Sequence, residues 1–199
     1  MSKSHSFIKF FAFLLVVSIA FSHGGCAKRE ALQSEEGSQE QTLWRILDEH
    51  GDIHSYLDED DEDVLEIMRL IRKHIACVDN RSAENIMFEE EAETYSSDFL
   101  ESLLASKYDD KLQAMYRNNE LAISSVSVIW NPNTINCDRT ACKVDIDSVF
   151  QFSAGSDSYL KALGVELNTN YIEHRLYYCE KIDDSWKITN IEKSSLYRN

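Results

Sequence analysis

Proline and glycine are scarce in this chain, whose 199 residues include one proline and six glycines. Fibrous and disordered proteins are usually richer in both, so the composition argues against those classes. Hydrophobic residues make up 43% of the chain, which is enough to build one core. We therefore expect one folded domain, of roughly 130 to 150 residues, behind an N-terminal leader.

Basic residues are also few, because 20 Lys and Arg stand against 35 Asp and Glu and the formal net charge is −15. The first 25 residues contain Lys3 and Lys9 but no acid, so 18 basic and 35 acidic residues follow them, a charge of −17. A surface of this sign repels a phosphate backbone, and we expect no nucleic-acid partner.

Long apolar runs are missing except for Phe10–Phe21, which only Ser18 interrupts. This run is too short to span a bilayer comfortably and follows two lysines, which is typical of a signal peptide. We assign the signal peptide to residues 1–25. The alternative is ordinary cleavage after Ala20.

The signal ends in His23-Gly24-Gly25-Cys26, which resembles the signal of bacterial lipoproteins. The resemblance implies that Cys26 becomes the lipidated first residue of the mature protein. Because Ala27 rather than Asp follows, it also implies a lipid anchor in the outer membrane, with the protein facing the periplasm. Residues 26–41 are polar and charged, as expected of lipid attachment followed by a flexible tether.

The chain has five cysteines, an odd number for an oxidising compartment, and lipidation of Cys26 would leave four. Cys137 and Cys142 bound a short loop between β-like segments, which predicts a disulfide. A zinc site is the alternative, but no second pair of ligands lies nearby, so we expect no metal. Cys77 and Cys179 are a second pair if a helix end meets the last hairpin, and otherwise two buried thiols.

Residues 42–60 are predicted to form a short helix and an acidic loop. Apolar residues at helical spacing are followed by a glycine that would stop the helix: Leu43, Trp44, Ile46, Leu47 and Gly51. The acidic run Asp58–Asp63 lacks the glycine and the terminal glutamate of an EF-hand calcium loop. We interpret these acids instead as favourable charges at the start of the next helix.

Residues 61–199 are predicted to form the main domain. Helical periodicity covers residues 61–77, 83–104 and 109–118, whereas two-residue alternation covers 122–130, 143–152, 171–182 and 186–191. The turn formers Asp183-Asp184-Ser185 join the last two strands in a hairpin. This order predicts an α+β fold, with N-terminal helices packed on a curved antiparallel sheet of about four strands.

Parts of this domain resemble the nuclear-transport-factor-2-like superfamily. They are the helix Asp61–Cys77, the turn Asp79–Ser82, the helix through Tyr95–Leu100 and the closing strand Asp184–Ile191 with its Trp-Lys-Ile sequence. The resemblance implies a cone of curved sheet wrapped around helices over roughly residues 61 to 193. The superfamily includes isomerases, dehydratases, secretion-system components and lipoproteins, so its fold does not choose a function.

Catalytic motifs are missing from the sequence. The spacing Ser158-x-x-Lys161 lacks the companion motifs of penicillin-binding folds. The strand faces offer one candidate pocket inside the cone, lined by Ser148, Phe150, His174 and Tyr178. A histidine there could act as a base, but such a residue is more often part of a core or rim. We assign no catalytic residue and no cofactor.

These features favour a membrane-tethered, non-enzymatic binding or assembly module of the bacterial cell envelope. The alternatives are a small-molecule-binding or isomerase-like enzyme that uses the cone pocket, and a component of a secretion or conjugation system. The other strand face is either solvated sheet or a surface for a protein partner or a second copy, and it carries Asp145, Asp147, Glu173, Arg175 and Tyr177.

Overall fold

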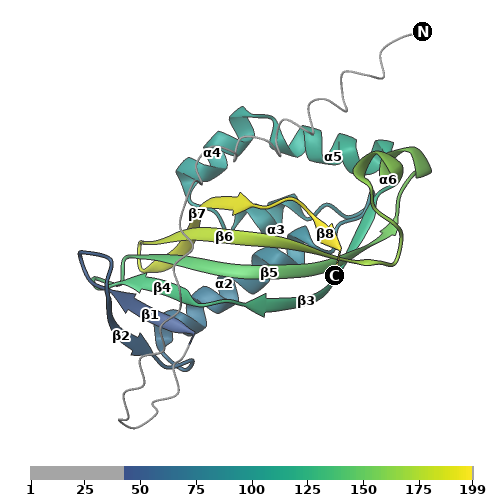
Figure 1. Ribbon diagram of the computed structural model, residues 1–199. Helices are drawn as coiled ribbons and strands as arrows, with labels where there is room; N and C mark the ends of the chain where they lie inside the picture. Colours follow the sequence, from purple (N-terminus) through teal and green to yellow (C-terminus); the bar gives the residue numbers. More distant parts are fainter. Residues whose placement is uncertain (1–42, 199) are drawn as a thin grey trace. The chain divides into compact units, whose positions relative to one another are not determined.

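The computed structural model of the protein describes residues 43–198 (Figure 1). The predicted signal peptide over 1–25, the lipidation of Cys26 and the whole tether over 26–41 lie outside the described residues. Two strands come first, β1 (Trp44–Leu47) and β2 (Ile53–Leu57). Helices follow: α2 (Glu62–Val78), α3 (Phe88–Ala92), α4 (Ser97–Ala105) and α5 (Tyr108–Asn118). The rest is β3 (Ala122–Trp130), β4 (Asn133–Asn136), β5 (Ala141–Ala154), α6 (Asp157–Leu163), β6 (Asn170–Ile182), β7 (Ser185–Lys193) and β8 (Tyr197–Arg198).

The strands form one mixed sheet of eight, so the α+β class is confirmed but the predicted four strands were too few. The order is β2-β1-β4-β5-β6-β7, with β3 also pairing with β5 and β8 with β6. The β1–β4 pair is parallel and the others are antiparallel. The four long strands are the predicted ones. The four missed strands are between two and five residues long, too short to show a clear alternation in the sequence.

The helix predicted within residues 42–50 is wrong, because Trp44–Leu47 is strand β1. Trp44 and Ile46 are buried and alternate with the half-buried Arg45 and Leu47. Four apolar residues in five positions fit a helix and a strand equally well, and pairing with β2 and β4 decides between them. Residues 44–57 therefore belong to the sheet rather than to a separate segment.

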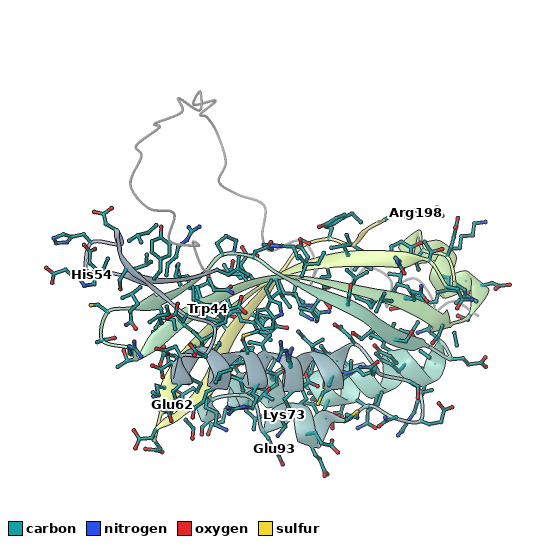
Figure 2. The ribbon with its side chains drawn as sticks, turned by 90° about the horizontal axis from the view of Figure 1, so that it is seen from below. Trp44, His54, Glu62, Lys73, Glu93 and Arg198 are labelled. Carbon is teal, nitrogen blue, oxygen red and sulfur yellow. The ribbon has the colours of Figure 1, made fainter. Side chains whose placement is uncertain are left out.

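Helix α2 packs along one face of the sheet, and Figure 2 shows the helices of residues 62–118 on one side of the strands. Asp61 caps this helix by accepting a hydrogen bond from the Asp63 N–H. The packed stripe of α2 consists of Val64, Ile67, Ile71, His74 and Ile75. It shares a core with side chains of the strands, among them Val144, Ile146, Tyr177, Cys179, Trp186 and Ile188.

The largely helical region predicted over residues 83–104, in one piece or two, is two helices, α3 and α4, separated by a short extended segment. This segment adds to the edge of the sheet, because Ile188 N–H donates to the Thr94 carbonyl at 2.9 Å and Ser96 N–H donates to the Ile188 carbonyl at 2.9 Å. Ser96 then caps α4 through its side chain, which accepts from the Phe99 N–H. Pairing of residues 94–96 with β7 therefore separates α3 from α4, although this region is rich in residues that favour a helix.

The last hairpin matches its prediction. Asp183 and Asp184 have φ angles of +48° and +60°, as a two-residue type I′ turn requires. Trp186 is buried in the core, and its Nε1 donates to the Asp63 Oδ1 at 3.1 Å. Asp63 also pairs with Lys181 at 2.9 Å. The end of the acidic run therefore fastens α2 to the last hairpin.

Candidate functional site

A chain of buried polar groups runs between α2 and the sheet, and it is the most highly charged part of the interior. Its members come from α2, α3 and strands β5 and β6, together with the segments that follow α2 and α3. We call it the interior network: His74, Asp79, Arg81, Glu91, Tyr95, Ser148, Arg175 and Tyr177. All eight residues are buried.

His74 lies at the middle of the network, between two tyrosines. Its Nδ1 is 3.1 Å from the Tyr177 hydroxyl and its Nε2 is 3.0 Å from the Tyr95 hydroxyl. Burial, aided by the nearby Lys193 and Arg175, holds the pKa of His74 well below its ordinary value, so the ring is neutral. Because Tyr95 donates its proton to Glu91 at 2.5 Å, the Tyr95 oxygen accepts from Nε2–H and Tyr177 donates to Nδ1.

Glu91 links Tyr95 to Arg81 within the interior network. The Arg81 guanidinium donates to one oxygen of the Glu91 carboxylate, and the Tyr95 and Tyr108 hydroxyls donate to the other. Both members of the ion pair are almost fully buried. Burial and the charge of Glu91 raise the pKa of Tyr95, which keeps its hydroxyl protonated. Both oxygens of the Glu91 carboxylate thus accept hydrogen bonds from within the protein, so we assign Glu91 a structural role.

Asp79 and Arg175 form the other end of the network. Arg175 binds Asp79 with both terminal nitrogens, at 2.6 and 3.0 Å, and its Nε donates to Glu173 at 2.5 Å. The Ser148 hydroxyl donates to the same Asp79 carboxylate. Burial alone would lower the pKa of Arg175, but Asp79 and Glu173 raise it well above its ordinary value. A charged guanidinium is thus fully paired inside the protein.

The predicted pocket residues do not come together. Ser148 and Phe150 face the helices, and the Arg175 guanidinium lies 5.9 Å from the centre of the Phe150 ring. His174 and Tyr178 lie on the opposite side of the sheet, since they alternate with the buried Arg175, Tyr177 and Cys179. The face assignment of β6 was therefore inverted, because Arg175 was taken for a solvated residue.

His74, Asp79 and Glu91 were not predicted from the sequence to be members of a site. His74 stands on the apolar stripe of α2, which was the available signal. Asp79 and Glu91 carried no such signal, because an acid after a helix and an acid within Glu89-Glu90-Glu91 both suggest solvent. Their partners are distant in sequence, and only the fold brings them together.

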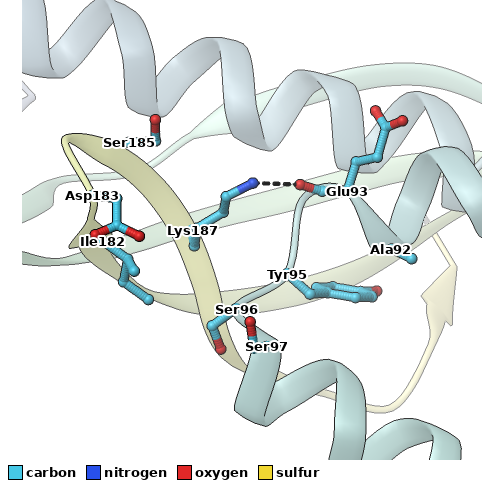
Figure 3. A pocket seen from close by; sticks show the side chains of 9 residues that line it. All are labelled: Ala92, Glu93, Tyr95, Ser96, Ser97, Ile182, Asp183, Ser185 and Lys187. Carbon is cyan, nitrogen blue, oxygen red and sulfur yellow. Dashed lines mark hydrogen bonds between the residues drawn. The ribbon is translucent and has the colours of Figure 1, made fainter.

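A surface hollow of about 320 Å³ lies between the start of α4 and the β6–β7 hairpin (Figure 3). Its lining is Ala92, Glu93, Tyr95, Ser96, Ser97, Ile182, Asp183, Ser185 and Lys187. Lys187 already donates to the Glu93 carbonyl at 2.8 Å. The lining contains no nucleophile paired with a base, and none of the four predicted pocket residues.

The sheet side away from the helices carries mixed polar and apolar groups, and we call it the outer face. We define it by Ile129, Asp145, Asp147, His174 and Tyr178. His174 Nδ1 is 3.0 Å from the Asp147 Oδ1 and 3.5 Å from the Asp145 Oδ1. Ile129, which pairs with Asp147 across the strands, is 49% exposed. The outer face thus offers two carboxylates, an imidazole and an uncovered isoleucine.

The cysteines differ from their predicted pairing. Within residues 43–198 all four are free thiols, and no group of His, Cys, Asp and Glu has an arrangement that could hold a metal ion. Cys137 lies in the exposed turn after β4, whereas Cys142 is held in the core because it pairs with Ile135. The two thiols therefore lie in different environments, one at the surface and one in the core. Cys77 is buried on α2, and Cys179 lies opposite Cys142.

No protein-family model and no curated protein matches this chain. Solved structures with similar folds include an IcmL-like type IV secretion system protein from Legionella pneumophila. It has 13% identity and a TM-score of 0.49, and the match covers 70% of this chain and 96% of the other. An NTF-2-like protein of unknown function from Shewanella oneidensis has 16% identity and a TM-score of 0.34, with 65% and 96% covered. Similarities at this level assign neither a family nor a function.

The described helices include none that is both long enough and apolar enough to cross a membrane.

Proposed function

We propose that the protein is a membrane-tethered, non-enzymatic binding or assembly module of the bacterial cell envelope, with a nuclear-transport-factor-2-like domain that binds a protein partner through its outer face. The leader ending in Cys26 and the polar segment 26–41 support the tether. The order of helices and strands supports the domain type.

One observation carries the proposal: the interior network occupies the space between α2 and the sheet, where the candidate pocket of the cone was expected. Arg175, Asp79, Arg81 and Glu91 are paired with one another and buried. A small-molecule site needs a concave space with a few free polar groups aimed into it. Here the charged groups of the interior network satisfy each other, which favours the outer surface as the place for recognition.

The chemistry of the outer face favours a partner with a basic surface. Asp145 and Asp147 stand in the centre of the sheet, and the whole chain carries a formal charge of −15. Two copies of so acidic a chain repel each other, whereas a basic protein is steered toward it. The exposed Ile129 beside these carboxylates provides apolar area that a partner can bury.

A photo-reactive amino acid at position 129 of the full chain, used in the native envelope, tests the proposal. Position 104 on α4 is the matched control, because Leu104 is 51% exposed on the other layer of the molecule. We expect one discrete adduct from position 129, weakened by Asp147→Lys, and only background from position 104. Equal labelling at both positions, or none at 129, would refute it. An adduct of twice the chain mass would show that the outer face binds a second copy of this chain, and it would refute the basic partner.

A further inference from the structure

Cys142 and Cys179 lie directly opposite each other on the neighbouring strands β5 and β6. On one side of the cysteines, the Lys181 N–H donates to the Thr140 carbonyl at 2.8 Å. On the other side, the pairing of β5 with β6 continues from Lys143 onward. The bond from Lys181 makes Cys142 and Cys179, two positions further along, a hydrogen-bonded pair, whose Cα atoms lie about 5.5 Å apart. Disulfides span Cα distances of about 4.4 to 6.8 Å, so the register suits a bond.

The surroundings of this pair exclude competing partners. Cys142 is 5% exposed and Cys179 is 1% exposed, and both belong to the core under α2. Burial, and then a hydrogen bond with Cys179, raise the pKa of Cys142 well above its ordinary value. Cys137 is exposed in its turn, and Cys77 lies on α2 beside the charge of Glu91. In the described chain, each of these two lacks a facing cysteine.

We propose that Cys142 and Cys179 form a disulfide across β5 and β6 when the chain folds under oxidising conditions, in place of the Cys137–Cys142 bond expected from the sequence. Two S–H bonds are lost and one S–S bond forms. The two electrons and two protons pass to the disulfide of a thiol–disulfide oxidoreductase, or of oxidised glutathione in the test tube, which is left as two thiols.

Burial decides when this bond forms. The attacking species is a thiolate, and two covered thiols, one with a raised pKa, provide almost none in the folded protein. Oxidation therefore takes place before α2 closes over the strands. Once formed, the bond is shielded from reductants in the same way. It closes a loop over residues 142–179, which restricts the unfolded chain and raises the midpoint of thermal unfolding by roughly 5 to 15 °C.

Peptide mapping after oxidative refolding tests this inference without depending on the compartment. The full chain is reduced in denaturant, refolded in detergent with oxidised and reduced glutathione, alkylated and digested without reductant. We expect a peptide that links Cys142 to Cys179, in the natural chain and equally in Cys137→Ser. The thermal midpoint should fall on reduction in denaturant and refolding without oxidant, but mild reductant should leave the native protein unchanged.

Several results would overturn the proposal. A bond between Cys137 and Cys142 would restore the sequence-based pairing, a bond between Cys137 and Cys179 would replace both pairings, and free thiols at both 142 and 179 after oxidative refolding would remove the bond altogether. The matched variant Cys179→Ser should lose the response of its thermal midpoint to oxidant. The same response in Cys179→Ser and in the natural chain would equally contradict the assignment.

Discussion

Arg175 holds a full positive charge in the interior, where its side chain is 3% exposed and that of Asp79 is 1% exposed. Moving such charges out of water is costly, and the bidentate geometry with the second carboxylate of Glu173 offsets that cost. The interior can therefore hold Arg175 and Asp79 together, whereas either residue alone would be a buried charge without a partner. A buried ion pair of this kind fixes how α2 meets β6.

Removing one member should destabilise the protein strongly. We predict that Arg175→Met lowers the free energy of unfolding by about 3 to 5 kcal/mol, because it leaves the Asp79 charge buried without a partner. The control Arg198→Met removes an ion pair with Glu166 whose two side chains are both more than half exposed. It should change the free energy of unfolding by less than about 0.5 kcal/mol. Urea denaturation of residues 42–199, which form one compact unit, measures both. Equal midpoints would show that Arg175 is solvated.

His74 makes stability depend on pH in a known direction. Its pKa in the folded state lies well below 6.5, so the unfolded state binds more protons as the pH falls. Stability is then fully present above about pH 6.5 and decreases below it, by at most about 1.4 kcal/mol per pH unit for one group. His74→Gln should be less stable at pH 7 but lose less stability between pH 7 and 5.5. An unchanged pH dependence would argue against a neutral buried His74.

At the scale of elements, the last hairpin is held against α2 by Trp186, which makes both an apolar contact and a hydrogen bond. Its indole packs in the core beneath α2, and its N–H donates to Asp63 at the start of that helix. The strand β7 is thereby fixed to a helix more than a hundred residues earlier in the chain. Two-residue alternation and a clear turn made this hairpin predictable.

We predict that Trp186→Ala unfolds or severely destabilises the domain, by about 3 to 5 kcal/mol, because it removes a large buried side chain and leaves a cavity. Lys187→Ala is the control on the opposite face of β7. It gives up one exposed hydrogen bond to the Glu93 carbonyl and should cost about 1 kcal/mol or less. Chemical denaturation separates the two. If both variants unfold at the same midpoint, Trp186 cannot be a core residue.

The long elements could be predicted from the sequence and the short ones could not. Helix α2 and strands β3, β5, β6 and β7 carry enough residues for their periodicity to stand out. Strand β1 has four residues and exists because β2 and β4 pair with it, which no local pattern reveals.

The site was less predictable than the fold for the same reason. Ser148 and Phe150 were placed inside correctly, because β5 alternates cleanly. His174 was placed inside wrongly, because in β6 a buried Arg175 interrupts the apolar alternation. Asp79 has partners 69 and 96 positions away in the chain, and such a charged residue resembles a surface residue until the fold is known.

At the scale of the whole molecule, the proposed lipid anchor at Cys26 precedes a domain whose interior polar network is buried. We predict that Cys26→Ser moves the full chain from the membrane into the soluble periplasmic fraction, since one residue carries the attachment. The domain itself should keep its thermal midpoint, because Cys26 precedes the compact unit that begins at Thr42. A natural chain already soluble, with its N-terminus at Phe21, would contradict the anchor.

The central claim is that the interior between α2 and the sheet is closed, and a thiol placed there measures this directly. Ser148→Cys puts a small reactive group next to Asp79, at a position that is 0% exposed. The exposed Cys137 of the same chain serves as the internal reference. We predict that an alkylating reagent labels position 148 of the native protein at least roughly a hundredfold more slowly than Cys137. Labelling at comparable rates would show an open cone and favour a ligand-binding protein or an enzyme.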